Sequence, residues 1–279
     1  RRFSHAGRGL PRPALLQSGT LPPMSWNPFA RLPNPREVFA WGIYDLANQS
    51  FQLLINTLLF ALFVKQVLAS DPARGEALWG TMSAAALLLV VVLSPVIGAV
   101  ADQKAWKREL LLGTGAVCAA LTCALAALEP GQVGLAFAIY VVAAVACGLG
   151  ENFLGSFLPE ISTPRNVGFV SALGWTTSYV GALLLLGITA IYCFALGREN
   201  IAQARPMFVF SGLWFALGMI PAALYLREKA TPQPERAGTI IAAAVERLVE
   251  SARQRAQFRQ LARFFLAFFV YSIGTMTVI

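Results

Sequence analysis

The chain has 279 residues, of which 57% are hydrophobic and 13% are charged, and its mean hydropathy is +0.61. A soluble domain carries about 25% charged residues, so this composition excludes an ordinary soluble protein and indicates that most of the chain lies in lipid. The formal net charge of +8 does not indicate a nucleic-acid partner, because the basic residues lie in short connections between apolar runs.

Residues 1–36 precede the first apolar run and are predicted to form a disordered cytoplasmic segment. They are rich in Arg, Gly and Pro, and they contain no apolar stretch long enough for the core of a signal peptide. Met24 is a candidate start of translation, in which case residues 1–23 are upstream translation.

Seven apolar segments follow along the chain. They are placed at about 38–64, 77–101, 109–128, 133–158, 167–196, 205–226 and 261–279. Each is near the roughly 20 residues that a helix needs to cross hydrocarbon. Lipid offers the backbone no hydrogen bonds, so segments of this length are predicted to be α-helices rather than barrel strands. The predicted fold class is therefore all-α, a polytopic membrane helix bundle.

The positions of Lys and Arg between the segments predict the orientation of this bundle. The connections on one side hold only Lys65, Arg74, Arg198 and Arg205. Those on the other side hold Arg31, Arg36, Lys104, Lys107, Arg108 and Arg165, together with a basic cluster after residue 226. Because short basic connections stay in the cytoplasm, the N-terminus is predicted to be cytoplasmic.

Residues 228–260 form a long connection that is predicted to be a cytoplasmic linker. Its part from 237 to 260 places apolar residues on one helical face, which indicates an amphipathic helix on the membrane surface; a plain solvated helix is the alternative. Residues 261–279 are interpreted as the first span of a second, truncated bundle. A six-helix unit at 37–227, a linker and a further span are the pattern of a transporter made of two six-helix halves.

The first apolar segment carries an unusual stripe of polar side chains. Its members are Asp45, Asn48, Gln49, Gln52 and Asn56. Steps of three and four residues place all five on one side of a helix, which lipid cannot face. The stripe is predicted to line a cavity for substrate or ion. The alternative is that it forms hydrogen bonds between helices that only hold the bundle together.

The fourth segment carries a second acid, Glu151, followed by Asn152. The first segment leaves the cytoplasm and the fourth returns to it, so Asp45 and Glu151 are predicted to lie at a similar depth of roughly 10 Å. Two carboxylates at one depth could share a proton or bind a cation, and both are candidate site residues. Separate hydrogen bonds to neighbouring helices are the alternative for each.

The connection between the second and third segments combines four residues of interest. They are Gly98, Asp102, Lys107 and Arg108. Gly98 permits close helix contact, Asp102 can accept from basic donors or cap the next helix, and the two basic residues anchor the connection inside. Ordinary positive charge on a cytoplasmic loop is the alternative.

The fifth segment carries a stripe of small residues that lets another helix approach closely. Its members are Ser171, Gly174, Ser178 and Gly181. Packing against another helix is the default interpretation of this stripe.

Metal and cofactor chemistry has few ligands in this sequence. The one histidine, His5, lies in the polar N-terminal segment, and the four cysteines lie in apolar stretches without CxxC spacing. No GxxxxGK[ST] loop or HExxH helix occurs. We therefore expect no metal, no cofactor and no enzymatic activity.

Several stretches resemble the vacuole-effluxer-like family of the major facilitator superfamily, whose eukaryotic members export amino acids from the vacuole. The resemblance runs from about Glu37 to Thr277. Its most specific pieces are EVFAWGIYDLANQSF at 37–51, LSPVIGAVADQKAWKR at 93–108, FLPEI at 157–161, VSALGWTTSYVGALLLL at 170–186, ARPMF at 204–208 and FFLAFFVYSIGT in the seventh segment. It implies a fold of major facilitator type, of which this chain holds the N-terminal six-helix half and the start of the second half.

The chain departs from that family at two places. In the 98–108 connection, Gln103 stands where a basic residue is usual, and Ala105 and Trp106 stand where Gly and Arg are usual. In the seventh segment, Ser272 and Ile273 follow the tyrosine where the family often has an Asn-Asp pair. These departures imply a weaker loop latch and the loss of one acid.

These observations together favour a secondary transporter in a bacterial cell membrane that moves a small polar solute, such as an amino acid, by alternating access. Coupling to a proton or sodium gradient is expected from the two acids, and membrane lipid is the surrounding partner. A non-transporting receptor or scaffold with a transporter fold is the alternative, favoured by the two departures.

Overall fold

The computed structural model describes residues 29, 32–69, 71–195, 197, 200–231, 263–264 and 266–272. Within these ranges every regular element is helical, so the predicted all-α fold is confirmed. Six helical rods there are long and apolar enough to cross a membrane: Pro35–Leu68, Ala73–Lys104, Lys107–Ala127, Val133–Ile161, Val167–Phe194 and Ile201–Tyr225. They coincide with the first six predicted segments.

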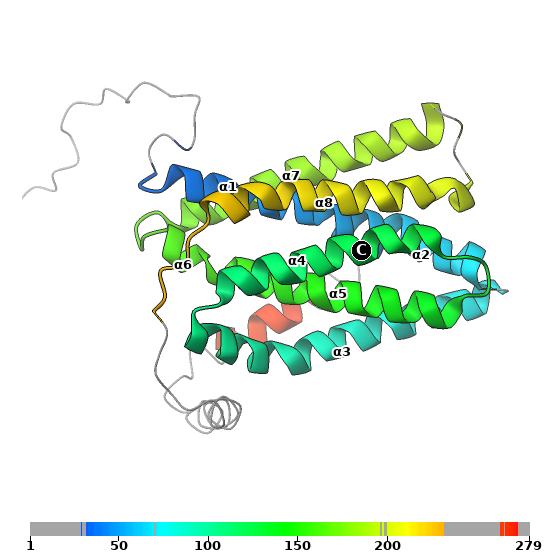
Figure 1. The fold of residues 1–279 in the computed structure, drawn as a ribbon, viewed down its shortest axis with the longest axis horizontal. Helices are drawn as coiled ribbons and strands as arrows, with labels where there is room; N and C mark the ends of the chain where they lie inside the picture. Colours follow the sequence, from blue (N-terminus) through cyan, green and yellow to red (C-terminus); the bar gives the residue numbers. More distant parts are fainter. Residues whose placement is uncertain are drawn as a thin grey trace, which may run out of the picture.

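The first rod, which includes the helices labelled α1 and α2 in Figure 1, changes helix type along its length. It begins as α1, Pro35–Gln49, with a proline in the first turn, where the missing amide proton costs no hydrogen bond. It continues through a π-helical stretch at Ser50–Leu58, α2 at Leu59–Phe63 and a second π-helical stretch at Val64–Leu68. Wide turns of this kind are rare and often occur at functional sites.

The remaining elements alternate in direction across the bundle. They are α3, Pro72–Lys104; α4, Lys107–Ala124, with a 3-10 turn at Leu125–Ala127; α5, Val133–Ser156; α6, Leu158–Ile161; α7, Val167–Ala190, with a π turn at Ile191–Ala195; a 3-10 turn at Ile201–Ala204; and α8, Arg205–Tyr225. We call the end that holds the start of α1, the α3–α4 turn, α6 and the end of α8 the N-terminal end of the bundle.

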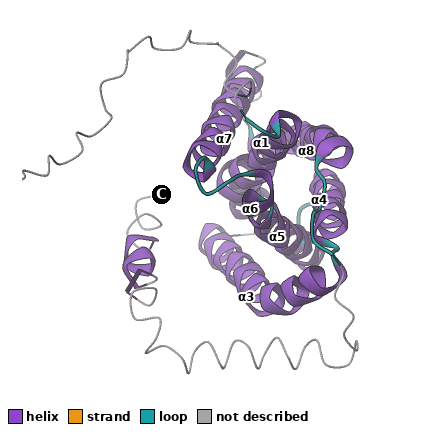
Figure 2. Cartoon of the chain, turned by 90° about the vertical axis from the view of Figure 1, so that its left-hand side faces the viewer, coloured by secondary structure: helices purple, strands orange, loops and turns teal. Residues whose placement is uncertain are grey.

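α1, α4, α5 and α8 form a compact group, and α3 and α7 flank it (Figure 2). α8 packs against both α1 and α4, and α4 packs against α5, while α7 packs on α1 and α3 packs on α5. Two glycines let α1 lie close to its neighbours. A Cβ on Gly181 of α7 would lie 2.6 Å from Cγ of Leu46, and one on Gly218 of α8 would overlap Ala47. Such close backbone approach stabilises helix pairs in lipid.

Aromatic side chains fill the core at the end of the bundle opposite to the N-terminal end. Phe60 stacks on Tyr140 of α5 with ring centroids 5.6 Å apart, and Phe208 of α8 lies edge-on to Phe60 and Phe63 at 5.7 and 5.4 Å. All four rings are fully buried. This cluster packs the core tightly at that end of the bundle.

The predicted surface helix at 237–260 lies outside the described residues, as does part of the predicted seventh span. Residues 263–264 and 266–272 are helical, and the seventh span stays a prediction. The domain boundaries predicted from the sequence remain predictions.

Candidate functional site

A cavity of about 460 Å³ lies between α1, α5 and α7 towards the N-terminal end of the bundle. Its lining residues are Trp41, Asp45, Gln49, Glu151, Leu154, Gly155, Leu158, Ser171, Trp175, Ser178 and Tyr179. Both predicted acids therefore face one cavity, although they lie more than a hundred residues apart in the chain. The volume falls within the range of about 300–1,000 Å³ that is usual for small-molecule sites.

Asp45 is held against α7. The Ser178 hydroxyl donates a hydrogen bond of 2.5 Å to Oδ2 of Asp45, and Nε2 of Gln49 lies 3.5 Å from the same hydroxyl oxygen. These contacts exist because Gly181 brings α7 close to α1 one turn further along. Asp45 is partly buried, and its second oxygen, Oδ1, accepts no hydrogen bond in the described part of the chain.

Glu151 is held by two amides from the first rod. Asn48 Nδ2 donates to Oε1 of Glu151 at 2.8 Å, and Gln52 Nε2 donates to the same oxygen at 2.6 Å. Asn48 is buried, whereas the side chain of Glu151 is exposed on the side of the cavity. Hydrogen bonds to a charged acceptor are strong, so these two amides fix the carboxyl group in one orientation.

The polar stripe continues behind Glu151 into the bundle. Asn56 Nδ2 lies 3.4 Å from Oε1 of Gln52, and the hydroxyl of Tyr140 donates to Oδ1 of Asn56 at 2.5 Å. The thiol of Cys147 contacts Oδ1 of Asn48 at 3.2 Å. The stripe thus faces α5 and α7, as predicted. Of its five members, Asp45 and Gln49 line the cavity, and the other three support Glu151 from behind.

Asn152 points in a different direction from Glu151. Its Nδ2 donates to the Ser94 hydroxyl of α3 at 2.8 Å, and Ser94 in turn donates to the Val90 carbonyl at 2.6 Å. Successive helical residues are about 100° apart, which turns Asn152 towards α3 and out of the cavity lining. Its contact ties α3 to α5.

Three aromatic residues of the cavity were not among the predicted site residues. Trp41 donates from Nε1 to the Leu154 carbonyl at 2.8 Å, and its ring occupies the space that a Cβ on Gly174 would need. Trp175 and Tyr179 form the outer rim, with ring centroids 5.9 Å apart. The sequence alone does not distinguish an aromatic residue that lines a cavity from one that faces lipid, because both lie in apolar spans.

The small-residue stripe of α7 does more than the predicted packing. Gly174 and Gly181 serve close approach to α1, as expected, but Ser171 and Ser178 line the cavity, and Ser178 binds Asp45. In the sequence, the spacing of the stripe placed the two serines on the same helical face as the two glycines. That shared face was the available signal that the serines approach another helix.

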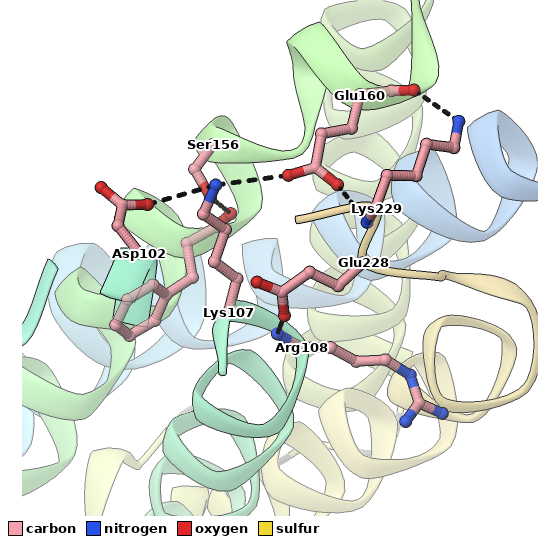
Figure 3. A network of polar contacts seen from close by, with 8 residues as sticks. Asp102, Lys107, Arg108, Ser156, Glu160, Glu228 and Lys229 are labelled. Carbon is pink, nitrogen blue, oxygen red and sulfur yellow. Dashed lines mark hydrogen bonds and ion pairs between the residues drawn. The ribbon is translucent and has the colours of Figure 1, made fainter. Parts of the chain in front are cut away.

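The α3–α4 connection forms an ion-pair network at the N-terminal end (Figure 3). Lys107 Nζ lies 3.2 Å from Oδ1 of Asp102 and 3.3 Å from Oε1 of Glu160 in α6. Of the two roles predicted for Asp102, this geometry corresponds to accepting from a basic donor. The Arg108 guanidinium donates to the Ala223 carbonyl of α8, which anchors the connection to the last helix.

The close helix contact expected at Gly98 is not found. No atom of the described residues lies within 4 Å of the position that its Cβ would take, apart from its own helix and chain neighbours. α3 packs mainly on α5, and that packing brings no side chain against the Cβ position of Gly98.

The chain after α8 joins the same network. The Lys229 amide donates to Oε2 of Glu160 at 2.9 Å, and its Nζ donates to the Glu160 carbonyl at 2.6 Å (Figure 3). The same Nζ lies 3.4 Å from Oε2 of Glu37. Oε2 of Glu228 accepts from the Arg108 amide at 3.2 Å. Glu160 is thus the hub between two connections, a role that its sequence context did not indicate.

Comparison with known proteins agrees with this architecture. A family model described as "Vacuole effluxer Atg22 like" matches residues 76–168 and 162–279. The MFS-type transporter YxiO of Bacillus subtilis (strain 168) is 25% identical over 248 residues, which cover 86% of this chain and 58% of that protein. The α-ketoglutarate permease of the same organism is 24% identical over 180 residues, which cover 62% of this chain and 38% of the permease.

The chain therefore spans little more than half the length of YxiO and a smaller share of the permease. Six apolar rods and this similarity establish a multi-pass membrane protein of major facilitator type. Because the family model covers most of the chain, the chain belongs to the vacuole effluxer Atg22-like family.

Proposed function

We propose that the protein is a secondary transporter that moves a small polar solute by alternating access around the cavity between α1, α5 and α7. The observation that carries the proposal is the pair Asp45 and Glu151, which come from different helices and line one cavity inside the membrane-spanning part. Ionisable residues in spans are costly and usually mark the path of a substrate or ion. The similarity to an MFS-type transporter and a permease supports the same function.

The placement of the flanking helices is consistent with a second half on one face of this bundle. α3 and α7 lie on either side of α1 and α5 (Figure 2). Residues of α1, α5 and α7 line the cavity. We propose that residues 37–227 form the first half, that 228–260 link it to the second, and that 261–279 begin that half. Rocking of two such halves would expose the site to each side in turn.

We propose coupling to protons, with sodium as the other candidate ion. The cavity lining holds two carboxylates and, in the described part of the chain, no basic side chain. Two negative charges that face one cavity repel each other, so a proton or a cation would relieve the unfavourable charge. If the solute replaces that proton in the cavity, the movement of protons across the membrane is coupled to the movement of solute.

We propose a bacterial cell membrane with the N-terminal end of the bundle in the cytoplasm. That end carries Lys104, Lys107 and Arg108 between α3 and α4, Arg165 between α6 and α7, and Arg227 and Lys229 after α8. The opposite end holds far fewer basic residues, which supports this orientation by the positive-inside rule. The family description names an effluxer, which supports export of a solute, and amino acids are one solute class that we propose.

A non-transporting receptor is the second candidate, and one observation favours it. Both polar side-chain atoms of Gln103 are buried without a hydrogen-bond partner among the described residues, in the connection where the family resemblance implies a basic residue. With Gln103 unpaired, the α3–α4 connection would stabilise one conformation of the transporter less than a complete ion-pair network would. Weaker stabilisation of one conformation is what a protein that no longer transports could tolerate.

Flux measurements separate the two candidates. The protein would be reconstituted in liposomes that contain the pH-sensitive dye pyranine, and pools of amino acids would be added outside. Solute-dependent proton movement supports transport. Solute binding in calorimetry without any flux of solute, protons or sodium would instead establish the receptor.

A further inference from the structure

Building on the proposed transport function, we propose that this half of the site binds the ammonium group of the solute, and that small organic amines with an apolar or aromatic body are its ligands. Asp45 and Glu151 would hold the charge, and the rings of Trp41, Trp175 and Tyr179 would cover the body.

The hydrogen bonds of the two acids leave one oxygen on each for a ligand. Asp45 uses Oδ2 for the Ser178 hydroxyl, and Glu151 uses Oε1 for both the Asn48 and Gln52 amides. Oδ1 of Asp45 and Oε2 of Glu151 accept no hydrogen bond within the described residues. All donors that reach the pair are neutral, so the negative charge stays uncompensated. An ammonium group supplies both the charge and up to three donors.

The aromatic rim suits a positively charged group. Trp175 and Tyr179 are 63% and 62% exposed, with their rings tilted 38° to each other across 5.9 Å at the cavity. Trp41 is fixed by its hydrogen bond to the Leu154 carbonyl. Indole and phenol faces attract cations within about 6 Å, and such rings recur in sites for alkylammonium ligands.

An organic cation fits the site better than a metal ion does. The cavity of about 460 Å³ is far larger than a bare ion needs. No cluster of three or more metal-ligating side chains of His, Cys, Asp or Glu occurs among the described residues. An anionic dicarboxylate would meet two like charges here and no basic donor, so its recognition would need the other half of the site entirely.

The test is isothermal titration calorimetry of the purified protein in lipid nanodiscs. The probes are phenethylamine, its N,N,N-trimethyl derivative, the neutral isostere 2-phenylethanol, and α-ketoglutarate. We expect both cations to bind and the alcohol and α-ketoglutarate not to bind. Asp45→Asn and Glu151→Gln should each weaken phenethylamine binding by about tenfold or more. Trp175→Leu should weaken it about threefold to tenfold, and Trp175→Phe less.

Two variants serve as matched controls. Asp71→Asn removes an exposed acid at the opposite end of the bundle, and Tyr225→Leu removes an exposed ring at the end of α8. Neither should change phenethylamine binding. Each variant must elute as a single species in size-exclusion chromatography, so that a folding defect is not counted as lost binding.

The outcomes keep this inference separate from the proposed function. Equal binding of 2-phenylethanol and phenethylamine, or unchanged amine binding in both acid variants, would overturn the ammonium site. If the liposomes carry leucine or α-ketoglutarate while no amine binds, transport stands and the ammonium site falls. If amines bind through Asp45 but no flux occurs, the ammonium site stands and transport falls.

Discussion

The hydroxyl of Ser178 in α7 donates a hydrogen bond of 2.5 Å to Oδ2 of Asp45 in α1, and so ties a flanking helix to the acid of the first rod. A hydrogen bond to a charged group contributes about 1.5–3 kcal/mol. We therefore expect Ser178→Ala to lower the apparent affinity for solute about tenfold or more in liposome uptake. Thr176→Ala is the control, because that exposed hydroxyl donates only to the Ala172 carbonyl of its own helix. Equal losses in both variants would contradict the role of Ser178.

The two amides on Glu151 are expected to differ in what they stabilise. Asn48 is buried, so Asn48→Leu leaves the buried Cys147 thiol without its acceptor, removes one of the two amides from Glu151, and should lower the free energy of unfolding by about 1–3 kcal/mol. Gln52 is only partly buried, so Gln52→Met should cost less stability while it still lowers uptake. Thermal unfolding and uptake of both variants check this. A larger stability loss in Gln52→Met than in Asn48→Leu would count against it.

The two ion pairs of Lys107 should be unequal. The side chains of Lys107 and Glu160 are 15% and 14% exposed, whereas that of Asp102 is 71% exposed. Solvent screens the exposed pair, so Asp102→Asn should lower stability by less than about 1 kcal/mol. Glu160→Gln should lower it by about 1–3 kcal/mol, because Glu160 also receives the Lys229 amide. Melting temperatures in detergent measure both, and a larger effect of Asp102→Asn would refute this ranking.

Glu228 predicts a dependence of stability on pH. Burial raises the pKa of Glu228 above its ordinary value of 4.5, and the negative charges of Glu160 and Glu109 raise it further, while the Arg108 amide and Lys107 lower it. With a native pKa above the unfolded one, the native state binds more protons. Stability is therefore lost as pH rises from the ordinary pKa through the raised one.

The variant Glu228→Gln removes this titration and keeps an acceptor for the Arg108 amide. We expect it to unfold at a higher temperature than the parent protein at about pH 8 and at nearly the same temperature at about pH 4. The difference should stay below about 1 kcal/mol, because the group is partly exposed. A variant less stable than the parent at the higher pH would contradict the raised pKa.

The sequence was sufficient to predict the six rods and the direction of the polar stripe. In continuous apolar runs, only a helix satisfies the hydrogen bonds of the backbone, which predicts the rods. A step of four residues is close to one turn in both α- and π-helices, which predicts the direction of the stripe. Gln52 and Asn56 therefore stay on the Glu151 side even though they lie in the π-helical stretch. The direction of the stripe could therefore be predicted without knowing the helix type.

Contacts between distant parts of the chain could not be predicted in the same way. Glu160 and Lys229 lie in two separate connections, and only the folded bundle brings them together. Trp175 and Tyr179 lie in an apolar span, where composition cannot distinguish a cavity rim from a lipid-facing surface. Asn152 adjoins Glu151 in sequence but faces α3, and which neighbour each face meets is fixed by packing.

The most direct test of the account concerns Asp45 and Glu151 as coupling acids. In liposomes, Asp45→Asn should abolish solute uptake driven by a proton gradient and leave downhill solute exchange partly intact, because exchange needs the site but no net proton movement. Asparagine keeps the shape of the side chain and can still accept from Ser178, so a purely structural role would survive the change. Normal gradient-driven uptake in both Asp45→Asn and Glu151→Gln would contradict the account and reduce both acids to packing residues.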